Sequence, residues 1–241
     1  MHRIDRLSAP LLVTWQLTRD CDLACLHCCT DSAPGKRLPD ELDADEAMRV
    51  ADEIIRLGVP YVMLCGGEPL VVPHFLALAE KLGGAGIRLK IETNGQRFAP
   101  AVAERLARLP IRSVQISLDG VNTNDVTIKV LKPLRKKLEA VIRAARFKVV
   151  LNAVIGSAPA AEAMEVVNFA RDNGLRPRVC LIHGGDGQMK LSPKDLAVYN
   201  EIKTRMGRRF REAGDYRTRL MHENRAPFKC RAGSRYLYVD E

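Results

Sequence analysis

The sequence predicts an α/β protein, a partial (β/α)6 TIM-like barrel of parallel strands with outer helices, and three observations support this fold class. Short apolar runs alternate with amphipathic stretches about six times along the 241 residues, which is the pattern of right-handed βαβ units and a parallel sheet. About six such units make an open barrel, because the closed form needs eight. Nearly every apolar run also breaks into Cys, Gly, Glu, Asn, Asp or His at its carboxyl end, the edge where parallel barrels carry their chemistry.

The apolar runs have the length and composition of buried strands. We expect strands over 11–17, 61–65, 87–91, 113–117, 148–154 and 178–182. Helices are expected over about 42–58, 73–82, 101–109, 134–146, 160–173 and 192–212. The first helix has the clearest boundaries, because Asp43-x-x-Glu46 resembles a capping box and the apolar face stops at Gly58.

Composition limits the class of protein. An apolar content of 46% is enough for one substantial core in a chain of this length. The net charge of +9 would suit an anionic partner, but the basic residues fall on helical or loop stretches, where solvated faces explain them better than a binding patch. Aromatic residues make up 5% of the chain and Trp15 is its one tryptophan, which argues against an aromatic platform for single-stranded nucleic acid. Nucleic acid is therefore not an expected partner.

The chain is expected to be cytoplasmic. Residues 1–10 lack the apolar core of a signal peptide, and no apolar run approaches the roughly 18 residues of a membrane span, so no membrane contact is expected. Seven cysteines are an odd number, which argues against a complete set of disulfides. Thiols that stay reduced in the cytoplasm suggest metal binding instead.

The densest chemistry follows the first expected strand, where Cys21, Cys25 and Cys28 lie at offsets of four and three. This run differs from the paired Cys-x2-Cys units of structural zinc sites. It suits an iron–sulfur cluster that is held by three soft thiolates and keeps one iron without a protein ligand. The alternative is a zinc knuckle that takes His27 or Cys29 as its fourth ligand.

Short polar segments follow the next three expected strands. They are Gly66-Gly67-Glu68-Pro69, Thr93-Asn94-Gly95 and Ser117-Leu118-Asp119-Gly120. Taken singly, each is an ordinary turn, although the paired glycines would also let the backbone approach a ligand closely. Together with the cysteine run, and in this order over residues 11–185, the segments resemble the radical S-adenosylmethionine (SAM) superfamily.

The resemblance implies that Cys21, Cys25 and Cys28 hold a [4Fe–4S] cluster whose open iron binds the amino and carboxylate groups of SAM. An electron from a flavodoxin-like or ferredoxin-like donor would cleave SAM to methionine and a 5′-deoxyadenosyl radical. That radical would abstract hydrogen from a peptide or small-molecule substrate. His27 would lie beside the cluster rather than bind it, and Cys29 would pack inward.

The resemblance also implies where SAM is held. The residues expected to contact it come from the ends of three strands and, for Asn152, from inside a fourth: Gly66, Gly67, Glu68, Thr93, Asn94, Ser117, Asp119 and Asn152. The loop that contains Glu68 would hold the α-amino group, and the side chains of Ser117 and Asp119 suit ribose hydroxyls. For Asn152, a satisfied structural amide and a SAM contact stay equally open.

The carboxyl end, Phe228–Glu241, resembles the opening of a SPASM-type extension, as in the pyrroloquinoline quinone and mycofactocin peptide maturases. We therefore expect a radical SAM domain over 1–212 and the beginning of such an extension over 213–241. In those enzymes the extension binds auxiliary iron–sulfur clusters, which this protein would hold only if the chain is truncated at its carboxyl end. A ribosomal peptide, a haem-type precursor and a small metabolite all stay open as substrates.

Two other classes of function stay open. A metal- or cluster-containing nucleic-acid-binding module would explain the basic balance without SAM turnover, and a degenerate relative would keep the cluster and lack turnover.

Two loops are also unusual. The loop after Gly120 is shorter than in relatives, and His183–Gly187 is a glycine-rich loop without the Lys-Ser/Thr pair of a phosphate loop.

Overall fold

One parallel sheet organises the protein. In the computed structural model, which describes residues 8–182, 191–206 and 233–240, seven strands lie in the order β6-β5-β4-β3-β2-β1-β7. Every neighbouring pair is parallel. The strands are β1 (Leu12–Gln16), β2 (Tyr61–Cys65), β3 (Arg88–Thr93), β4 (Ile111–Ser117), β5 (Lys148–Ile155), β6 (Arg176–Leu181) and β7 (Tyr236–Val239). This arrangement confirms the predicted open barrel of parallel strands.

The strand β7 goes beyond the expected six units. It falls in the segment that was expected to begin a separate extension, yet it pairs with β1 at the edge of the sheet. Leu237 and Val239 pack against the core, and the Tyr238 hydroxyl donates a hydrogen bond to the Gln16 side chain at 2.6 Å. These contacts bring the described carboxyl end of the chain beside its first strand.

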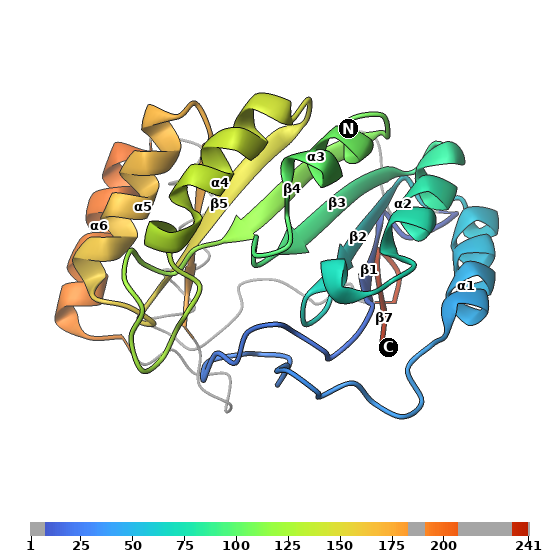
Figure 1. The fold of residues 1–241 in the computed structure, drawn as a ribbon, viewed down its shortest axis with the longest axis horizontal. Helices are drawn as coiled ribbons and strands as arrows, with labels where there is room; N and C mark the ends of the chain where they lie inside the picture. Colours follow the sequence, from blue (N-terminus) through green and yellow to red (C-terminus); the bar gives the residue numbers. More distant parts are fainter. Residues whose placement is uncertain (1–7, 183–190, 207–232, 241) are drawn as a thin grey trace.

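Helices follow the strands and cover the outer face of the sheet (Figure 1). They are α1 (Ala44–Leu57), α2 (Phe75–Gly84), α3 (Pro100–Leu106), α4 (Leu131–Ala144), α5 (Ala160–Asp172) and α6 (Pro193–Arg205), with a short 3-10 helix, η1 (Pro69–Val71). The helix α4 begins earlier than expected because Pro133 is tolerated in a first helical turn. The capping box of α1 is confirmed: the Glu46 N–H donates to Asp43 at 2.8 Å and the Asp43 N–H to Glu46 at 3.1 Å.

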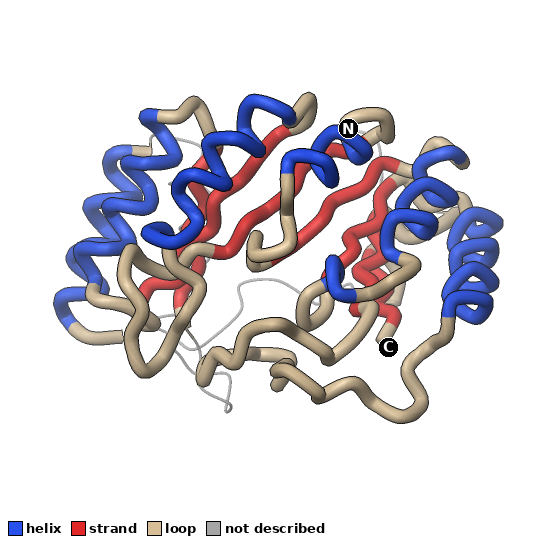
Figure 2. Tube along the Cα trace, in the orientation of Figure 1, coloured by secondary structure: helices blue, strands red, loops and turns tan. Residues whose placement is uncertain are grey.

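The two faces of the sheet differ in character. Fully buried side chains alternate along the strands with partly exposed ones, and the buried set forms one core with the helices. That core includes Trp15, Leu64 and Ile116. The helices lie on one side of the sheet, while long loops cross its open end (Figure 2). A parallel sheet covered on both faces would show continuous apolar strands. Here apolar positions alternate with polar ones, and polar side chains such as Glu92 and Gln115 lie on the inner face.

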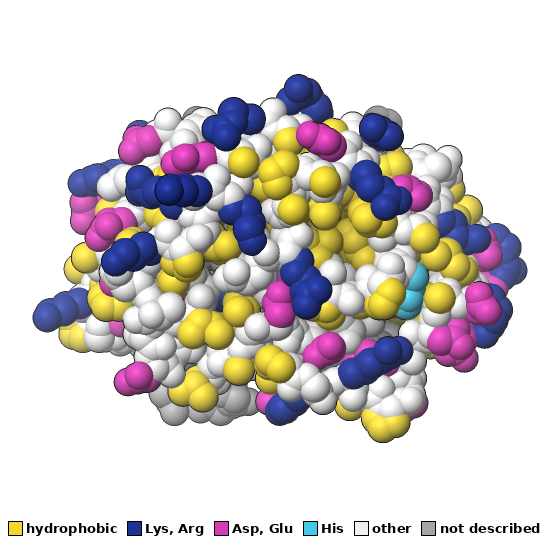
Figure 3. Space-filling view, viewed as in Figure 1, with side chains coloured by type: hydrophobic (Ala, Val, Ile, Leu, Met, Phe, Trp, Pro, Cys, Tyr) yellow, Lys and Arg dark blue, Asp and Glu magenta, His cyan; other side chains and the backbone are white. Residues whose placement is uncertain are grey.

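Charge is mixed over the visible surface. Lys and Arg side chains in Figure 3 are scattered among Asp and Glu rather than gathered into one patch. This distribution fits solvated helix faces, as the sequence predicts. Within the described ranges, no helix combines the length and apolarity that a membrane span requires.

Candidate active site at the carboxyl ends of the strands

The chain that follows β1 and the loop that follows β2 are joined by backbone contacts. The Gly67 N–H donates to the Thr18 carbonyl at 2.7 Å, and the Glu68 N–H donates to the Asp20 carbonyl at 3.0 Å. A Cβ on Gly67 would lie 2.2 Å from the Asp20 oxygen, and Gly66 has a φ of +140°, which favours glycine. Both glycines are therefore required by the close approach of a neighbouring segment of the chain itself.

The Glu68 carboxylate lies beneath this junction and is fully buried. Its Oε1 accepts hydrogen bonds from the Leu70 N–H at 3.0 Å and the Thr93 hydroxyl at 2.8 Å, and its Oε2 accepts one from the Asn94 N–H at 2.7 Å. Burial raises the pKa of Glu68 to about 7, although the bonds from Asn94, Thr93 and Leu70 oppose that shift. Glu68 thus joins the ends of β2 and β3.

Asn94, just after β3, reaches the cysteine loop, which we define as residues 21–29. Its Nδ2 lies 2.7 Å from Asp22 Oδ1 and 3.6 Å from Cys21 Sγ. The Arg97 Nε donates to the other oxygen of Asp22 at 3.1 Å. No motif singled out Asp22, because its place in the site follows from partners more than seventy residues away, the separation to Asn94 being 72.

The predicted cluster cysteines lie on the cysteine loop, and their thiols are free. Burial raises the pKa of Cys21 to about 11. Burial also acts to raise the pKa of Cys28, but hydrogen bonds from Thr30 and Ser32 and the nearby Lys129 ammonium outweigh it, so this pKa is lowered. The Thr30 hydroxyl and the Ser32 N–H each lie 3.3 Å from Cys28 Sγ. Hydrogen bonds to cysteine sulfur are one of the ways in which proteins tune iron–sulfur clusters.

The β4 loop, residues 121–130, packs on the cysteine loop from the other side. The Leu26 N–H donates to the Val126 carbonyl at 3.1 Å, and His27 Nδ1 lies 3.3 Å from the same oxygen. The His27 Nε2 lies 3.0 Å from Oδ2 of the fully buried Asp119. The loop that the sequence marked as short is therefore part of the site.

A buried carboxylate that no motif predicted, Glu41, anchors the chain on both sides of the cysteine loop. Its Oε2 accepts a hydrogen bond from the Thr18 hydroxyl at 2.8 Å. Its Oε1 accepts the Arg19 N–H at 2.8 Å and the Leu38 N–H at 3.1 Å. The loops after β1, β2, β3 and β4 thus form one continuous hydrogen-bonded layer over the carboxyl edge.

The family model for the Radical SAM superfamily matches residues 15–197, from β1 into α6. The chain belongs to the radical SAM superfamily. Enzymes of this superfamily use a [4Fe–4S] cluster and SAM, the two cofactors that the cysteine run and the polar strand ends predict.

Individual radical SAM relatives cover different parts of the chain. The mycofactocin maturase MftC of Mycobacterium tuberculosis (strain CDC 1551 / Oshkosh) is 46% identical over 114 residues, or 47% of this chain and 29% of that protein. The pre-heme d1 synthase of Dinoroseobacter shibae is 34% identical over 176 residues, or 72% of this chain and 43% of that protein. The chain thus spans less than half of the length of both relatives.

A solved structure shows the same fold. The crystal structure of Streptococcus suis SuiB bound to precursor peptide SuiA matches with a TM-score of 0.72 and 19% identity, over 98% of this chain and 58% of that chain. At this identity the likeness concerns the fold alone. It agrees with an open parallel sheet covered by helices on its outer face.

The three cysteines fit a radical SAM cluster by their donor chemistry, because they place three soft thiols on one loop and two of these, Cys21 and Cys28, lie within reach of neighbouring N–H or O–H donors. Across residues 8–182, 191–206 and 233–240, no group of three or more Cys, His, Asp or Glu side chains converges closely enough to hold a single metal ion. A four-iron cluster requires a larger separation between the sulfur atoms than a single metal ion does, because each thiolate binds a different iron atom.

The predicted SAM contacts fall into two groups at the carboxyl edge. The ends of β2 and β3 carry Gly66, Gly67, Glu68, Thr93 and Asn94, which are linked as described above. Ser117 ends β4 and pairs in the strand register with Asn152, which lies inside β5, and Asp119 follows β4. Asn152 Oδ1 accepts a hydrogen bond from the Cys180 thiol at 3.2 Å. That bond gives the buried amide a structural partner, while its contact with SAM and those of the other residues stay predictions.

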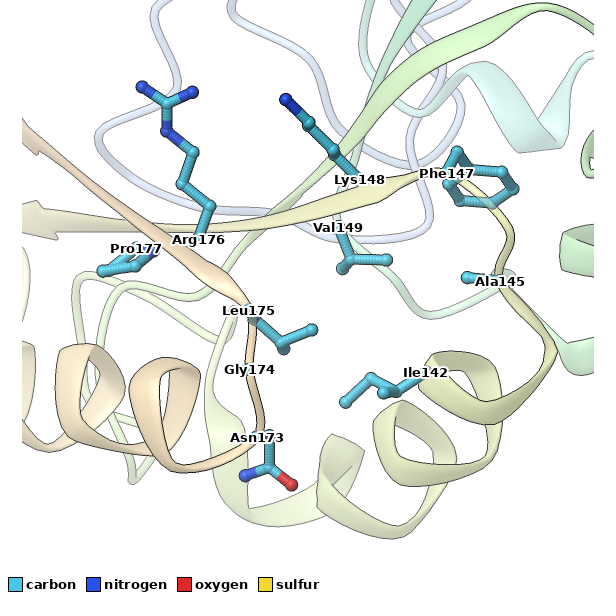
Figure 4. Close-up of a pocket in the computed structure, with 10 residues that line it drawn as sticks. All are labelled: Ile142, Ala145, Phe147, Lys148, Val149, Asn173, Gly174, Leu175, Arg176 and Pro177. Carbon is cyan, nitrogen blue, oxygen red and sulfur yellow. The ribbon is translucent and has the colours of Figure 1, made fainter.

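Other features lie away from these contacts. The loop His183–Gly187 and most of the expected extension, including Cys230, fall outside the described residues. An open hollow of about 630 Å³ lies at the amino ends of β5 and β6, where side chains such as Ile142, Phe147 and Leu175 form its wall (Figure 4). This is the edge of a parallel barrel that contributes stability rather than chemistry.

Proposed function

We propose that this protein cleaves SAM reductively at a [4Fe–4S] cluster held by Cys21, Cys25 and Cys28. One observation carries the proposal: the cysteine loop is hydrogen-bonded to Asn94 at the end of β3 and to Val126 after β4. A cluster on this loop would therefore face the strand ends that are expected to hold SAM. When bound, the cluster and SAM supply the electron transfer and the 5′-deoxyadenosyl radical that abstracts hydrogen from the substrate.

The residues of the chain have distinct parts in this proposal. Ser117 and Asp119 would bind the ribose hydroxyls; one oxygen of Asp119, Oδ1, has no hydrogen-bond partner among the described residues. The backbone of the loop at Gly66–Glu68 would hold the α-amino group of SAM. The Glu68 carboxylate supports that loop from below through its three hydrogen bonds, so we assign it the positioning of the loop in addition to its expected contact. Thr93 and Asn94 would complete this side of the pocket, and Asn152 the side at β5.

The substrate is proposed as a peptide or a small molecule such as a haem-type precursor. Two relatives that share this part of the chain are named for these two classes, a mycofactocin maturase and a pre-heme d1 synthase, and SuiB was solved with a precursor peptide. The inner face of the sheet is polar, with Glu92 and Arg178 3.7 Å apart, so it suits a substrate with polar groups. A flavodoxin-like or ferredoxin-like protein would supply the electron.

Anaerobic reconstitution tests the proposal. The wild-type protein is expected to bind iron and sulfide and to form 5′-deoxyadenosine from SAM in the presence of dithionite. The Cys25→Ala variant should lose both the cluster and the product. Cys29, which was expected to pack inward, is exposed, so Cys29→Ala is a matched control that should keep both. A wild-type protein with neither cluster nor 5′-deoxyadenosine would contradict the proposal, as would full activity in Cys25→Ala.

The nucleic-acid-binding alternative makes a different prediction. It requires an affinity for nucleic acid that falls steeply with salt concentration, because phosphate contacts release counterions. The mixed charges in Figure 3 provide no continuous basic face on that side of the molecule. We therefore expect weak binding of the wild-type protein to single- and double-stranded DNA in a fluorescence-anisotropy titration at 150 mM salt, which corresponds to roughly physiological ionic strength.

A further inference from the structure

A compact charged network links the β4 loop to the cysteine loop. The loop is closed at its base, where the Asp119 N–H donates to the Lys129 carbonyl at 2.7 Å and the Leu131 N–H to the Gly120 carbonyl at 3.0 Å. Its turn is held by Asn124, whose Oδ1 accepts two backbone N–H groups at 2.7 and 2.9 Å. These contacts hold the backbone of the loop that carries Lys129.

Asp119 is the centre of the network. Its carboxylate has no exposed surface, and its Oδ2 accepts a hydrogen bond from the Thr127 hydroxyl at 2.6 Å. The same oxygen lies 3.0 Å from His27 Nε2 and 3.4 Å from Lys129 Nζ. The Lys129 side chain is 19% exposed. A buried ammonium needs a paired anion to be tolerated, and Asp119 provides that pair.

The network lies directly against the expected cluster ligands. His27 stands between Cys25 and Cys28 in the sequence, and its ring touches both Val126 and Asp119. Burial by itself would lower the pKa of Lys129, but the negative charges of Asp119, Cys25 and Cys28 outweigh it and raise this pKa. The position of the ammonium is given by geometry: Lys129 contacts the Asp119 oxygen that lies beside His27, the residue that precedes Cys28.

We propose that Lys129, positioned by Asp119, places a positive charge beside the cysteine loop that raises the reduction potential of the cluster bound there. The inference rests on the proposed function, because it needs a cluster on Cys21, Cys25 and Cys28. Three thiolates give a [4Fe–4S] centre in its oxidised 2+ state a net negative charge, and one electron from the reductant makes it more negative. A nearby cation stabilises the reduced state more than the oxidised state, so Lys129 favours electron uptake.

The midpoint potential of the cluster tests this inference, measured without SAM by a redox titration that is followed by electron paramagnetic resonance. Replacing Lys129 by Met removes the charge and keeps the length of the side chain. We expect the reduction equilibrium to shift toward the oxidised state by about tenfold, or about 59 mV for a one-electron couple. Lys129→Arg keeps the charge and should stay near the wild-type potential. Lys148→Met, at an exposed position on the opposite edge of the sheet, should not change it.

Asp119→Asn separates electrostatics from structural damage. This variant removes an anion from the same network and keeps a side-chain oxygen of the same shape beside the Lys129 ammonium, so the potential should move in the positive direction, opposite to Lys129→Met. Damage to the loop would move both variants the same way. An unchanged potential in Lys129→Met, or shifts of equal sign in the two variants, would overturn the inference.

The outcomes also distinguish this inference from the proposed function. A wild-type protein that assembles no cluster overturns both. A wild-type protein that forms 5′-deoxyadenosine while Lys129→Met keeps its potential overturns only the role of Lys129 in tuning. If Lys129→Met keeps its potential and loses SAM affinity in an equilibrium binding measurement, Lys129 pairs with the SAM carboxylate instead, and the inference is wrong.

Discussion

The two edges of the sheet use polar side chains in opposite ways. At the carboxyl edge, Glu68 and Asp119 have no exposed surface, and both are hydrogen-bonded to side chains from other segments. At the amino edge, the strands β3, β5 and β6 begin with the exposed Arg88, Lys148 and Arg176, and the last two of these line an open hollow.

This difference predicts how each edge responds to substitution. A buried polar group that loses its partner costs about 1–3 kcal/mol, whereas an exposed side chain changes stability by less than about 0.5 kcal/mol. The carboxyl edge should therefore be intolerant of change even before a cofactor binds. The amino edge and the helix ends that lead to it should tolerate change.

The largest effect is expected for Gly67→Ala. The added Cβ would lie 2.2 Å from the backbone oxygen of Asp20, so the junction between the ends of β1 and β2 must move, at a cost of about 3 kcal/mol in the free energy of unfolding. Gly84→Ala is the control at the amino edge. Its Cβ would meet nothing within 4 Å and it lies in α2, so it should stabilise by about 0.5–1 kcal/mol. Urea unfolding of both variants measures the difference, and equal effects would remove the contrast between the edges.

The second prediction concerns the pH dependence of stability. The pKa of Glu68 rises from 4.5 to about 7 on folding, mainly because the group is buried, so the native state binds more protons than the unfolded chain between these values. The contribution of this carboxyl to stability is therefore largest below about pH 4.5 and declines as the pH rises through 7, by about 3 kcal/mol in total.

Glu68→Gln tests this sign, because glutamine does not titrate. We expect unfolding free energies measured at pH 5 and pH 8 to differ less in Glu68→Gln than in the wild type. Glu80→Gln, at an exposed position on α2, should keep the wild-type difference. A wild-type slope that survives in Glu68→Gln would show that another group causes it.

The sequence predicts best what short segments determine. The strands, the α1 capping box and its end at Gly58 depend on side chains within a few residues of one another, so periodicity and cap residues were sufficient. The cysteine run and the polar strand ends were likewise visible because each is local. The pairing of β7 with β1 joins the two ends of the chain, and no local pattern encodes it.

The supporting residues of the site were not predicted from the sequence for the same reason. Glu41, Asp22 and Lys129 belong to no motif, and the partners Thr18, Asn94 and Asp119 lie ten or more residues away in the sequence. Even the glycines were predicted for an incomplete reason. Close approach to a ligand was expected, whereas the structure also brings the backbone of Thr18 and Asp20 against Gly66 and Gly67.

A smaller effect is expected where the carboxyl edge meets solvent. Glu162 Oε2 accepts the N–H groups of Val121 and Asn122 at 2.6 and 3.0 Å, and so holds the beginning of the β4 loop. Glu162→Ala leaves two N–H groups without this partner but open to water, so we expect a loss of about 1 kcal/mol and faster hydrogen exchange in the β4 loop. Glu165→Ala, exposed on the same helix, is the control. Unchanged exchange in Glu162→Ala would mean that the loop is held by its other contacts.

The smallest effect is expected at the ion pair between Arg105 and Glu80, on the outer helices α3 and α2. The Arg105 Nη2 and Glu80 Oε1 atoms are 2.6 Å apart, but the two side chains are 51% and 47% exposed. Solvent screens such a pair, so a double-mutant cycle with alanine should give a coupling of about 0.2–0.5 kcal/mol. The same cycle at Glu68 and Thr93, whose bond is 2.8 Å long and buried, should give a larger coupling because water cannot replace either partner. Two similar couplings would mean that burial, the feature that separates the two regions, does not set the strength of their polar contacts.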